Sequence, residues 1–295
     1  MMNERKIFAL GFFDGVHLGH QALLRACGDL AREKGCLAAA ITFDRHPRSL
    51  FTPNPPPLLS TPQDRKLLLR RYGIGPIYQY PVTGETMSMS WQAFLEELVE
   101  CGAVGFVCGD DFRFGHKGEG NAEKLRLFCR ERGMPCAIIP EQELDGIRIS
   151  STYIRSLLAL GHMHSAGRFL GHPHFLTGEV VSGRKLGGKL GFPTANVEIP
   201  EGIACPRHGV YACRVWVDGA CYAAVTNVGS RPTVEGHQVR TESWIQDFSG
   251  DLYGKTVTLE FHYFLRPEKK FGSVEQLKAA VLADAARARN YFAEN

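Results

Sequence analysis

In the first half of the chain, short apolar runs alternate with amphipathic segments of helical period. The runs cover residues 6–12, 36–43, 77–80, 105–109 and 136–140. The amphipathic segments cover residues 21–35, 64–73, 90–102 and 122–133. Strand followed by helix, repeated, predicts an α/β doubly wound domain, a parallel sheet covered by helices. Such sheets bind ligands at the carboxyl ends of their strands, where the strand order reverses.

From about residue 172 the pattern changes to strands separated by glycines. Residues 208–229 form two strands around Asp218-Gly219, a signal for a two-residue hairpin. Residues 256–264 alternate, with Val257, Leu259, Phe261 and Tyr263 on one face. This half therefore predicts a small all-β barrel or sandwich. A closing helix over residues 273–292 should cover it with one apolar stripe, namely Val274, Leu277, Ala280, Val281 and Ala285.

Length and composition favour two ordinary globular domains. The chain has 295 residues, 44% of them apolar and 22% charged. No apolar stretch approaches the ~18 residues of a membrane span, and the N-terminus lacks the features of a signal peptide, so we expect a soluble cytoplasmic protein. Nine cysteines without a C-x-x-C pair predict reduced thiols.

The net charge of +3 is too small to predict a nucleic-acid-binding surface. One basic run stands out, and its members are Arg65, Lys66, Arg70 and Arg71. Leucines at helical spacing interrupt this run, so we interpret it as a solvated helix face.

The segment Gly11–His20, G-F-F-D-G-V-H-L-G-H, directly follows the first predicted strand. A lone histidine there would be a structural cap, but His17 and His20 are three residues apart, which puts both imidazoles on one face of the first helical turn. Glycines let a polyphosphate approach the backbone, and a helix N-terminus favours anions. We therefore expect an ATP site whose histidines follow charge from the α-phosphate to the leaving diphosphate. Its expected residues are Gly11, Phe13, Asp14, Gly15, His17, Gly19 and His20.

A second anion site is predicted at Ile149–Arg155, I-S-S-T-Y-I-R, before an apolar helical run. The simplest role of Ser151 and Thr152 is to cap that helix. Arg155, one turn inside, could hold the β- and γ-phosphates of ATP. Paired with H-x-G-H, this motif resembles the nucleotidyltransferase superfamily that includes class I aminoacyl-tRNA synthetases and phosphopantetheine adenylyltransferases.

The resemblance narrows with G-D-D-F-R-F-G at residues 109–115 and H-K-G-E-G-N at residues 116–121. Over about residues 7–170 the ordered motifs resemble the FAD synthetase module of bacterial bifunctional riboflavin kinase/FAD synthetases, a Rossmann-like domain. In that family this segment lines the site where ATP and FMN meet, which implies a flavin-side role for Asp111, Phe112 and Phe114. Many members have an arginine in this segment where this chain has Gly118.

The glycine-rich run at residues 183–190, G-R-K-L-G-G-K-L, fits the P-loop spacing only in part. Leu190 has no hydroxyl to bind Mg²⁺, and Pro193 prevents the helix that a P-loop requires. The following G-F-P-T-A-N offers the hydroxyl of Thr194 and the amide oxygen of Asn196, which point the same way on an extended chain. Such oxygens suit Mg²⁺ carried in with ATP, although a glycine-rich turn ending in a cap is the simpler reading of these residues alone.

Later motifs favour the catalytic reading, because G-V-Y at 209–211, N-V-G at 227–229, D-L-Y-G at 251–254 and R-P-E at 266–268 follow in order. With Glu242 they resemble the riboflavin kinase module over about residues 172–292. The resemblance implies that Glu242 is the general base that accepts the ribityl hydroxyl proton. It also implies kinase ATP contacts at Gly183, Gly188, Lys189, Thr194 and Asn196, Mg²⁺ with ATP at Thr194 and Asn196, and flavin contacts at Asn227 and Arg266.

Taken together, the resemblance implies a bifunctional enzyme of flavin synthesis. Residues 171–295 would convert riboflavin and ATP to FMN, and residues 1–170 would convert FMN and ATP to FAD and diphosphate. Its catalytic residues would be His17, His20, Arg155 and Glu242. Its partners would be riboflavin, FMN and ATP, with no nucleic acid and no membrane. Two alternatives stay open, a monofunctional riboflavin kinase with an inactive first domain and a non-catalytic flavin-binding sensor.

Overall fold

The computed structural model describes residues 4–181, 194–233 and 236–295. Gly183, Gly188 and Lys189, expected to contact ATP, lie outside the described residues. The chain divides into two compact units, residues 1–151 and 152–295, and each is described by itself. No helix among the described residues is long and apolar enough to cross a membrane.

The first unit is built on a parallel sheet of five strands in the order β3-β2-β1-β4-β5, as predicted for a doubly wound domain. Its strands are β1 (Lys6–Leu10), β2 (Leu37–Phe43), β3 (Ile77–Tyr80), β4 (Ala103–Gly109) and β5 (Cys136–Ile139). Its helices are α1 (Leu18–Glu33), α2 (Pro62–Arg71), α3 (Gly84–Ser88), α4 (Trp91–Glu100) and α5 (Ala122–Glu131), with 3-10 turns η1 (Asp14–Val16), η2 (Pro47–Leu50) and η3 (His116–Gly118). A two-stranded hairpin, β6 (Glu143–Leu144) and β7 (Ile147–Arg148), completes the unit.

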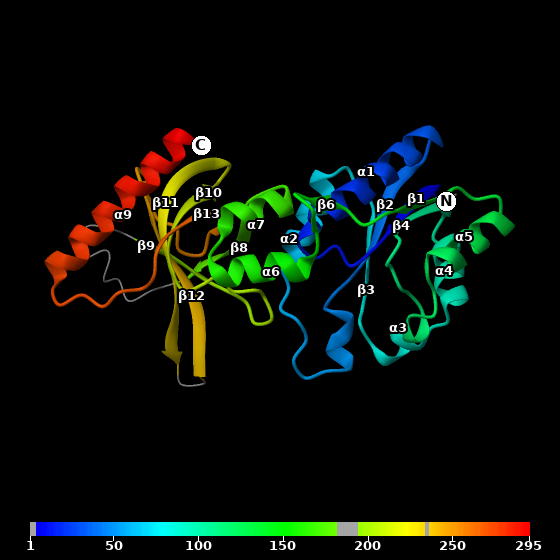
Figure 1. The fold of residues 1–295 in the computed structure, drawn as a ribbon, viewed down its shortest axis with the longest axis horizontal. Helices are drawn as coiled ribbons and strands as arrows, with labels where there is room; N and C mark the ends of the chain where they lie inside the picture. The colour runs from blue at the N-terminus through cyan, green and yellow to red at the C-terminus, as the bar shows by residue number, and fades with distance from the viewer. Residues whose placement is uncertain (1–3, 182–193, 234–235) are drawn as a thin grey trace. The chain divides into compact units, whose positions relative to one another are not determined.

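Helices cover both faces of this sheet (Figure 1). Phe8 and Leu10 of β1 belong to one buried cluster with apolar residues of α4 and α5. Successive strand residues point to opposite faces, so Ile7 and Ala9 face the other side. There α1 packs on the sheet, and the Cys27 thiol donates to the Ile7 carbonyl at 3.3 Å. The sheet is therefore buried on both faces, as its continuous apolar runs predict.

Helix α2 corrects the interpretation of the basic run. Arg70 and Arg71 are exposed, but the Arg65 side chain is completely buried. Leu68 and Leu69, three and four residues further along, are buried too. Because positions i, i+3 and i+4 share a helix face, Arg65 belongs to the packed face of α2 and not to the solvated one.

The second unit contains a closed barrel of six strands in the order β10-β11-β12-β9-β8-β13. Its strands are β8 (His174–Val181), β9 (Thr194–Glu198), β10 (Gly209–Val217), β11 (Ala220–Thr233), β12 (Gly236–Ile245) and β13 (Thr256–Arg266). Its helices are α6 (Ser151–Leu160), α7 (Met163–Leu170) and α9 (Val274–Glu294). This decides between the two predicted β architectures in favour of the barrel. The predicted hairpin joins β10 to β11, with positive φ at Asp218 and Gly219 as a primed turn requires.

Strand β13 departs from the simple alternation expected of it. Val257, Leu259 and Phe261 are buried as predicted, but Tyr263 is 44% exposed. The ladder with β10 pairs Cys213 with Phe261 and Ala212 with Tyr263, a register shift that leaves one extra residue in β13. Such a bulge changes which residues face the barrel, so Tyr263 instead stacks on Tyr291 of α9 at 5.2 Å between ring centroids.

Helix α9 packs on the barrel with a stripe shifted from the predicted one. Ala285 and Ala288 are fully buried, whereas Val274 is exposed because the helix begins there, directly after its Ser273 cap. A charged residue, Asp284, is also buried in this stripe. Its partner is Arg266 at the end of β13, whose Nε and Nη2 donate to Oδ2 at 2.9 and 2.8 Å.

Candidate functional sites

A cavity of about 270 Å³ lies at the carboxyl end of the parallel sheet in the first unit. Strand β1 has β2 on one side and β4 on the other, so the strand order reverses beside it. The lining comes from the segments after β1, β4 and β5, the first turn of α1, and residues 148–151. These residues are Leu10, Gly11, Phe12, His17, Gly19, His20, Leu23, Gly109, Asp110, Asp111, Phe112, Ile139, Pro140, Glu141, Gln142, Arg148, Ile149, Ser150 and Ser151.

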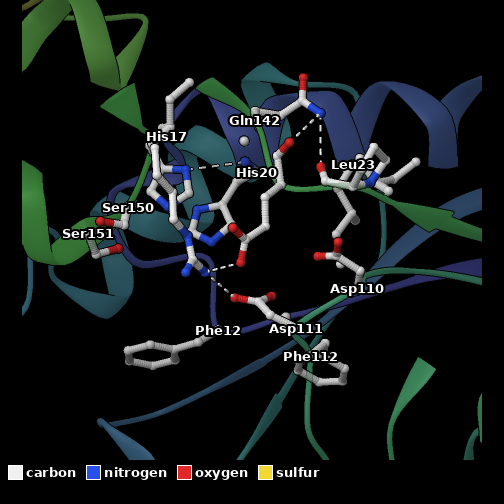
Figure 2. A pocket seen from close by; sticks show the side chains of 18 of the residues that line it. Phe12, His17, His20, Leu23, Asp110, Asp111, Phe112, Gln142, Ser150 and Ser151 are labelled. Carbon is white, nitrogen blue, oxygen red and sulfur yellow. Dashed lines mark hydrogen bonds and ion pairs between the residues drawn. The ribbon is translucent and has the colours of Figure 1, made fainter. Parts of the chain in front are cut away.

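His17 and His20 are side by side at this cavity (Figure 2). Their rings stack with centroids 3.7 Å apart and planes 10° apart. His17 is the N-cap of α1, and its Nδ1 accepts from the backbone N–H of His20 at 3.3 Å. Burial, the neighbouring His17 ring and the Arg65 guanidinium lower the pKa of His20 well below its ordinary value, so this ring is neutral at physiological pH.

Phe13, Asp14 and Gly15 shape the loop from behind and do not line the cavity. The Asp14 carboxylate accepts from the backbone N–H groups of Leu59 and Ser60, at 2.7 and 3.3 Å for the same oxygen. Phe13 is buried, with its ring edge on His20 at 5.3 Å between centroids. These side chains hold the loop in place, and contact between the nucleotide and this part of the loop would use its backbone.

The lining of the cavity also includes two charged residues that the motifs did not identify, Glu141 and Arg148. Arg148 of β7 donates to Asp111 at 3.0 Å and pairs with Glu141 after β5. Phe112 lines the cavity, whereas Phe114 stacks behind it at 5.8 Å and is buried in the α4/α5 core. The Asp145-Gly146 pair, a hairpin-turn signal between Leu144 and Ile147, was the available sequence signal for the hairpin that carries Arg148.

Ser151 lines the cavity, and its hydroxyl donates to the Asp14 carbonyl at 3.2 Å. Thr152 and Arg155 belong to the second unit, on α6, where Arg155 Nη2 donates to Thr152 Oγ1 at 3.2 Å.

In the barrel, four of the predicted kinase residues lie on three adjacent strands, β9, β12 and β11. Glu242 of β12 is directly opposite Asn196 of β9 on one side and Asn227 of β11 on the other. Thr194 Oγ1 donates to Glu242 Oε1 at 2.9 Å. Asn227 Nδ2 donates in turn to Glu268 at 3.1 Å, a carboxylate that the motif R-P-E contained without an assigned role.

The kinase residues share the barrel face that packs against α9. Val225 and Trp244, which pack with α9, have the same strand parity as Asn227 and Glu242. Arg266, expected to contact flavin, holds Asp284 of α9 through its guanidinium. The structure thus brings Thr194, Asn196, Asn227 and Glu242 together and places Arg266 at the helix that borders them.

The hydroxyl of Thr194 and the amide of Asn196 lie beside a carboxylate, a set of hard oxygen donors that fits Mg²⁺ arriving with ATP. Within the described ranges, no cluster of three or more His, Cys, Asp or Glu side chains could hold a metal ion. All nine cysteines lie in described segments and are free thiols.

Comparison with known proteins finds a family match for each half of the chain. The family model described as FAD synthetase matches residues 1–153, and the one described as riboflavin kinase matches residues 170–292. A bifunctional riboflavin kinase/FMN adenylyltransferase of Listeria monocytogenes is 34% identical over 98% of this chain and 93% of its own. The Pseudomonas fluorescens protein of that name is 36% identical over 96% of this chain and 92% of its own.

This chain belongs to the bifunctional riboflavin kinase/FMN adenylyltransferase family. The resemblance stated from the motifs is therefore confirmed. A crystal structure titled as a macrolide-efflux protein from Streptococcus pneumoniae has a TM-score of 0.88, with 32% identity over 98% of this chain and 95% of that one. Its fold is similar to the fold described above.

The residue ranges matched by the two family models correspond closely to the two compact units. The FAD synthetase match ends two residues beyond the first unit, and the riboflavin kinase match covers the barrel and most of α9. Helices α6 and α7 lie in the second unit, largely between the two matches.

Proposed function

We propose that this chain makes FMN from riboflavin and ATP in its barrel unit, and FAD from FMN and ATP at the sheet cavity. The observation that carries this proposal is that each family match coincides with one cluster of the predicted catalytic side chains. His17 and His20 cluster within the FAD synthetase match, and Thr194, Asn196 and Glu242 cluster within the riboflavin kinase match.

At the sheet cavity, an oxygen of the FMN phosphate attacks the α-phosphorus of ATP, and the bond to diphosphate breaks. The nucleophile is already ionised, so the protein needs no general base for this step. His17 and His20 offer N–H donors toward oxygens whose charge grows during transfer, and the N-terminus of α1 adds its own positive end. Ser151, which lines the cavity, is proposed for the β- and γ-phosphates.

In the barrel, the primary ribityl hydroxyl attacks the γ-phosphorus of ATP, and ADP leaves. This hydroxyl is a weak nucleophile, and Glu242 is proposed to orient it and accept its proton. The hydrogen bond from Thr194 fixes the position of that carboxylate on the strand. Bound Mg²⁺ would neutralise phosphate charge, with Thr194 and Asn196 as its proposed protein ligands.

The test is to incubate the pure protein with riboflavin, ATP and Mg²⁺ and to separate the flavins by chromatography. We expect FMN to appear first and FAD after it. FMN alone would support the alternative of a monofunctional kinase with an inactive first domain. Neither product, with riboflavin still bound, would support the alternative of a flavin-binding sensor.

A further inference from the structure

Arg65 is a completely buried guanidinium next to the adenylyl-transfer cavity, and neither motif includes it. Its guanidinium carbon lies 4.4 Å from the ring centroid of Phe12, which lines the cavity. The guanidinium also acts electrostatically on His20, a second lining residue. Arg65 therefore lies directly behind the segment that must receive ATP.

One nitrogen of Arg65 fastens the ends of two neighbouring strands. Nη1 donates to the carbonyls of Phe12 and Phe43 at 3.1 and 3.0 Å, and to Thr42 Oγ1 at 3.0 Å. The Thr42 hydroxyl donates to the same Phe12 carbonyl at 2.7 Å. The backbone after β1 is thus fixed at Phe12, a residue that lines the cavity.

The remaining nitrogens of Arg65 are less well satisfied. Nε and Nη2 are buried and have no hydrogen-bond partner among the described residues. Asp14 and Asp44 are close enough for their charges to oppose the effect of burial, which nevertheless lowers the pKa of Arg65 to about 10. The side chain therefore stays cationic at neutral pH. A buried, under-satisfied cation is costly, and a purely apolar residue would pack here more cheaply.

An anionic ligand offsets that cost. A charge in a weakly polar interior acts on a neighbouring anion with less screening than an exposed lysine or arginine would. We propose that Arg65 is a positioning residue for adenylyl transfer, whose buried charge and hold on the Phe12 carbonyl prepare the cavity for the triphosphate of ATP. This inference rests on the proposed function of the first unit.

The same charge sets the protonation of His20. Three causes lower the pKa of the His20 ring: its burial, the stacked His17 ring and the charge of Arg65 on α2. The edge of Phe13 adds a further apolar neighbour. Removing the charge at position 65 should therefore move the pKa of His20 upward, toward its ordinary value near 6.5.

The experiment compares variants that separate charge from shape. Arg65→Met removes the charge, Arg65→Lys keeps it, and Arg70→Met removes an exposed cation from the same helix as a matched control. Arg65→Met should raise the KM for ATP in FAD formation by about tenfold, the size of one charge-assisted hydrogen bond. The KM for ATP in FMN formation should not change, because that reaction uses the barrel unit. Histidine ring NMR should show the upward shift of the His20 titration.

Arg65→Lys and Arg70→Met should keep both the parental KM and the parental His20 titration. Arg65→Gln repeats the neutral substitution with a side chain that still donates to the strand-end carbonyls, in case Arg65→Met does not fold. Thr42→Val removes one partner of Arg65 and one hydrogen bond to the Phe12 carbonyl but leaves the charge, so it should raise the KM for ATP less than Arg65→Met does.

The proposal is overturned if Arg65→Lys or Thr42→Val raises the KM for ATP in FAD formation as much as the neutral variants do, since position 65 would then act through packing alone. It is also overturned if the neutral variants retain the parental KM for ATP. A parental enzyme that makes no FAD refutes the proposed function instead. In that case, ATP binding measured by calorimetry and the His20 titration still test Arg65.

Discussion

Glu242 is held between two strands by side chains that would also contact substrate. Thr194 donates to one of its oxygens, and the neighbours directly across the sheet are Asn196 and Asn227. A carboxylate fixed in this way loses little freedom when the ribityl hydroxyl arrives, which is what a general base requires. Removing only its basicity is therefore a clean test.

Glu242→Gln should lower the rate of FMN formation by ~10²–10⁴-fold, the usual contribution of general-base catalysis. The amide oxygen can still accept from Thr194, so the strand pairing and the binding of riboflavin should remain. FAD formation from added FMN serves as the internal control and should continue. A variant that phosphorylates riboflavin at the parental rate would show that Glu242 is structural.

His17 combines two tasks that different substitutions separate. His17→Ala removes an imidazole facing the cavity and the cap of α1, so FAD formation should fall by ~10²–10³-fold and stability by about 1 kcal/mol. His17→Asn keeps a good cap and lacks the imidazole, so stability should return while activity does not. Flavin chromatography and thermal unfolding measure the two effects. Full activity in His17→Asn would mean that His17 serves only as a cap.

At residue scale, sequence reasoning identified side chains whose chemistry is tied to a local motif. His17, His20, Asp111 and Ser151 line one cavity. Spacing placed the two histidines on one helix face, whereas Asp111 was expected there only from the family resemblance. Arg148 was missed, because its contact with Asp111 depends on a loop folding back over 37 residues of sequence. Asp14 lies in the recognised motif, yet its carboxylate binds the backbone of a loop 45 residues away, a partner that no local pattern reveals.

At the scale of elements, a partly buried ion pair joins α9 to the barrel. Arg266 grips both oxygens of Asp284, and the helix then buries Ala285 and Ala288 beside the strands that carry Asn227 and Glu242. Helical periodicity predicted that this helix would pack. It did not predict a carboxylate in the packed stripe, since the pairing depends on where β13 ends.

Asp284→Asn should destabilise the protein by about 2–4 kcal/mol, because it leaves a partly buried guanidinium without its counter-charge. Urea unfolding followed by barrel fluorescence measures this loss. Lys278→Gln, at an exposed position of the same helix, is the control and should change stability by less than about 0.5 kcal/mol. A double replacement, Arg266→Met with Asp284→Leu, should recover much of the stability. An unchanged urea midpoint in Asp284→Asn would show that the pair does not anchor the helix.

At the scale of the whole molecule, the change from strand-helix alternation to strands alone correctly predicted two different architectures. The boundary between them is harder to read. Helices α6 and α7 look like a continuation of the first half in sequence, yet they fall into the compact unit of the barrel. Their residues contact it directly, since the Arg207 N–H donates to the Leu158 carbonyl at 3.0 Å.

Two fragments test whether α6 and α7 belong to the folding unit of the barrel. Residues 171–295 and residues 152–295 should both convert riboflavin to FMN, because each holds Thr194, Asn196, Asn227 and Glu242. The longer fragment should melt at a higher temperature, since it retains the buried Met163, Ala166 and Phe169 of α7. Equal melting temperatures would place α6 and α7 outside the folding unit of the barrel. Loss of kinase activity in both folded fragments would contradict the division of the two reactions.

Closure of the barrel has a consequence for the behaviour of this protein at high concentration. The described strands of this unit close into a barrel, which leaves little open edge on which a foreign chain could add a further strand, although β8 and β9 pair over only two residues. The parallel sheet does end in open edges, but β3 and β5 there have only four residues each. Short edges template poorly, and both architectures thereby resist the strand-by-strand growth that leads to amyloid-like fibres.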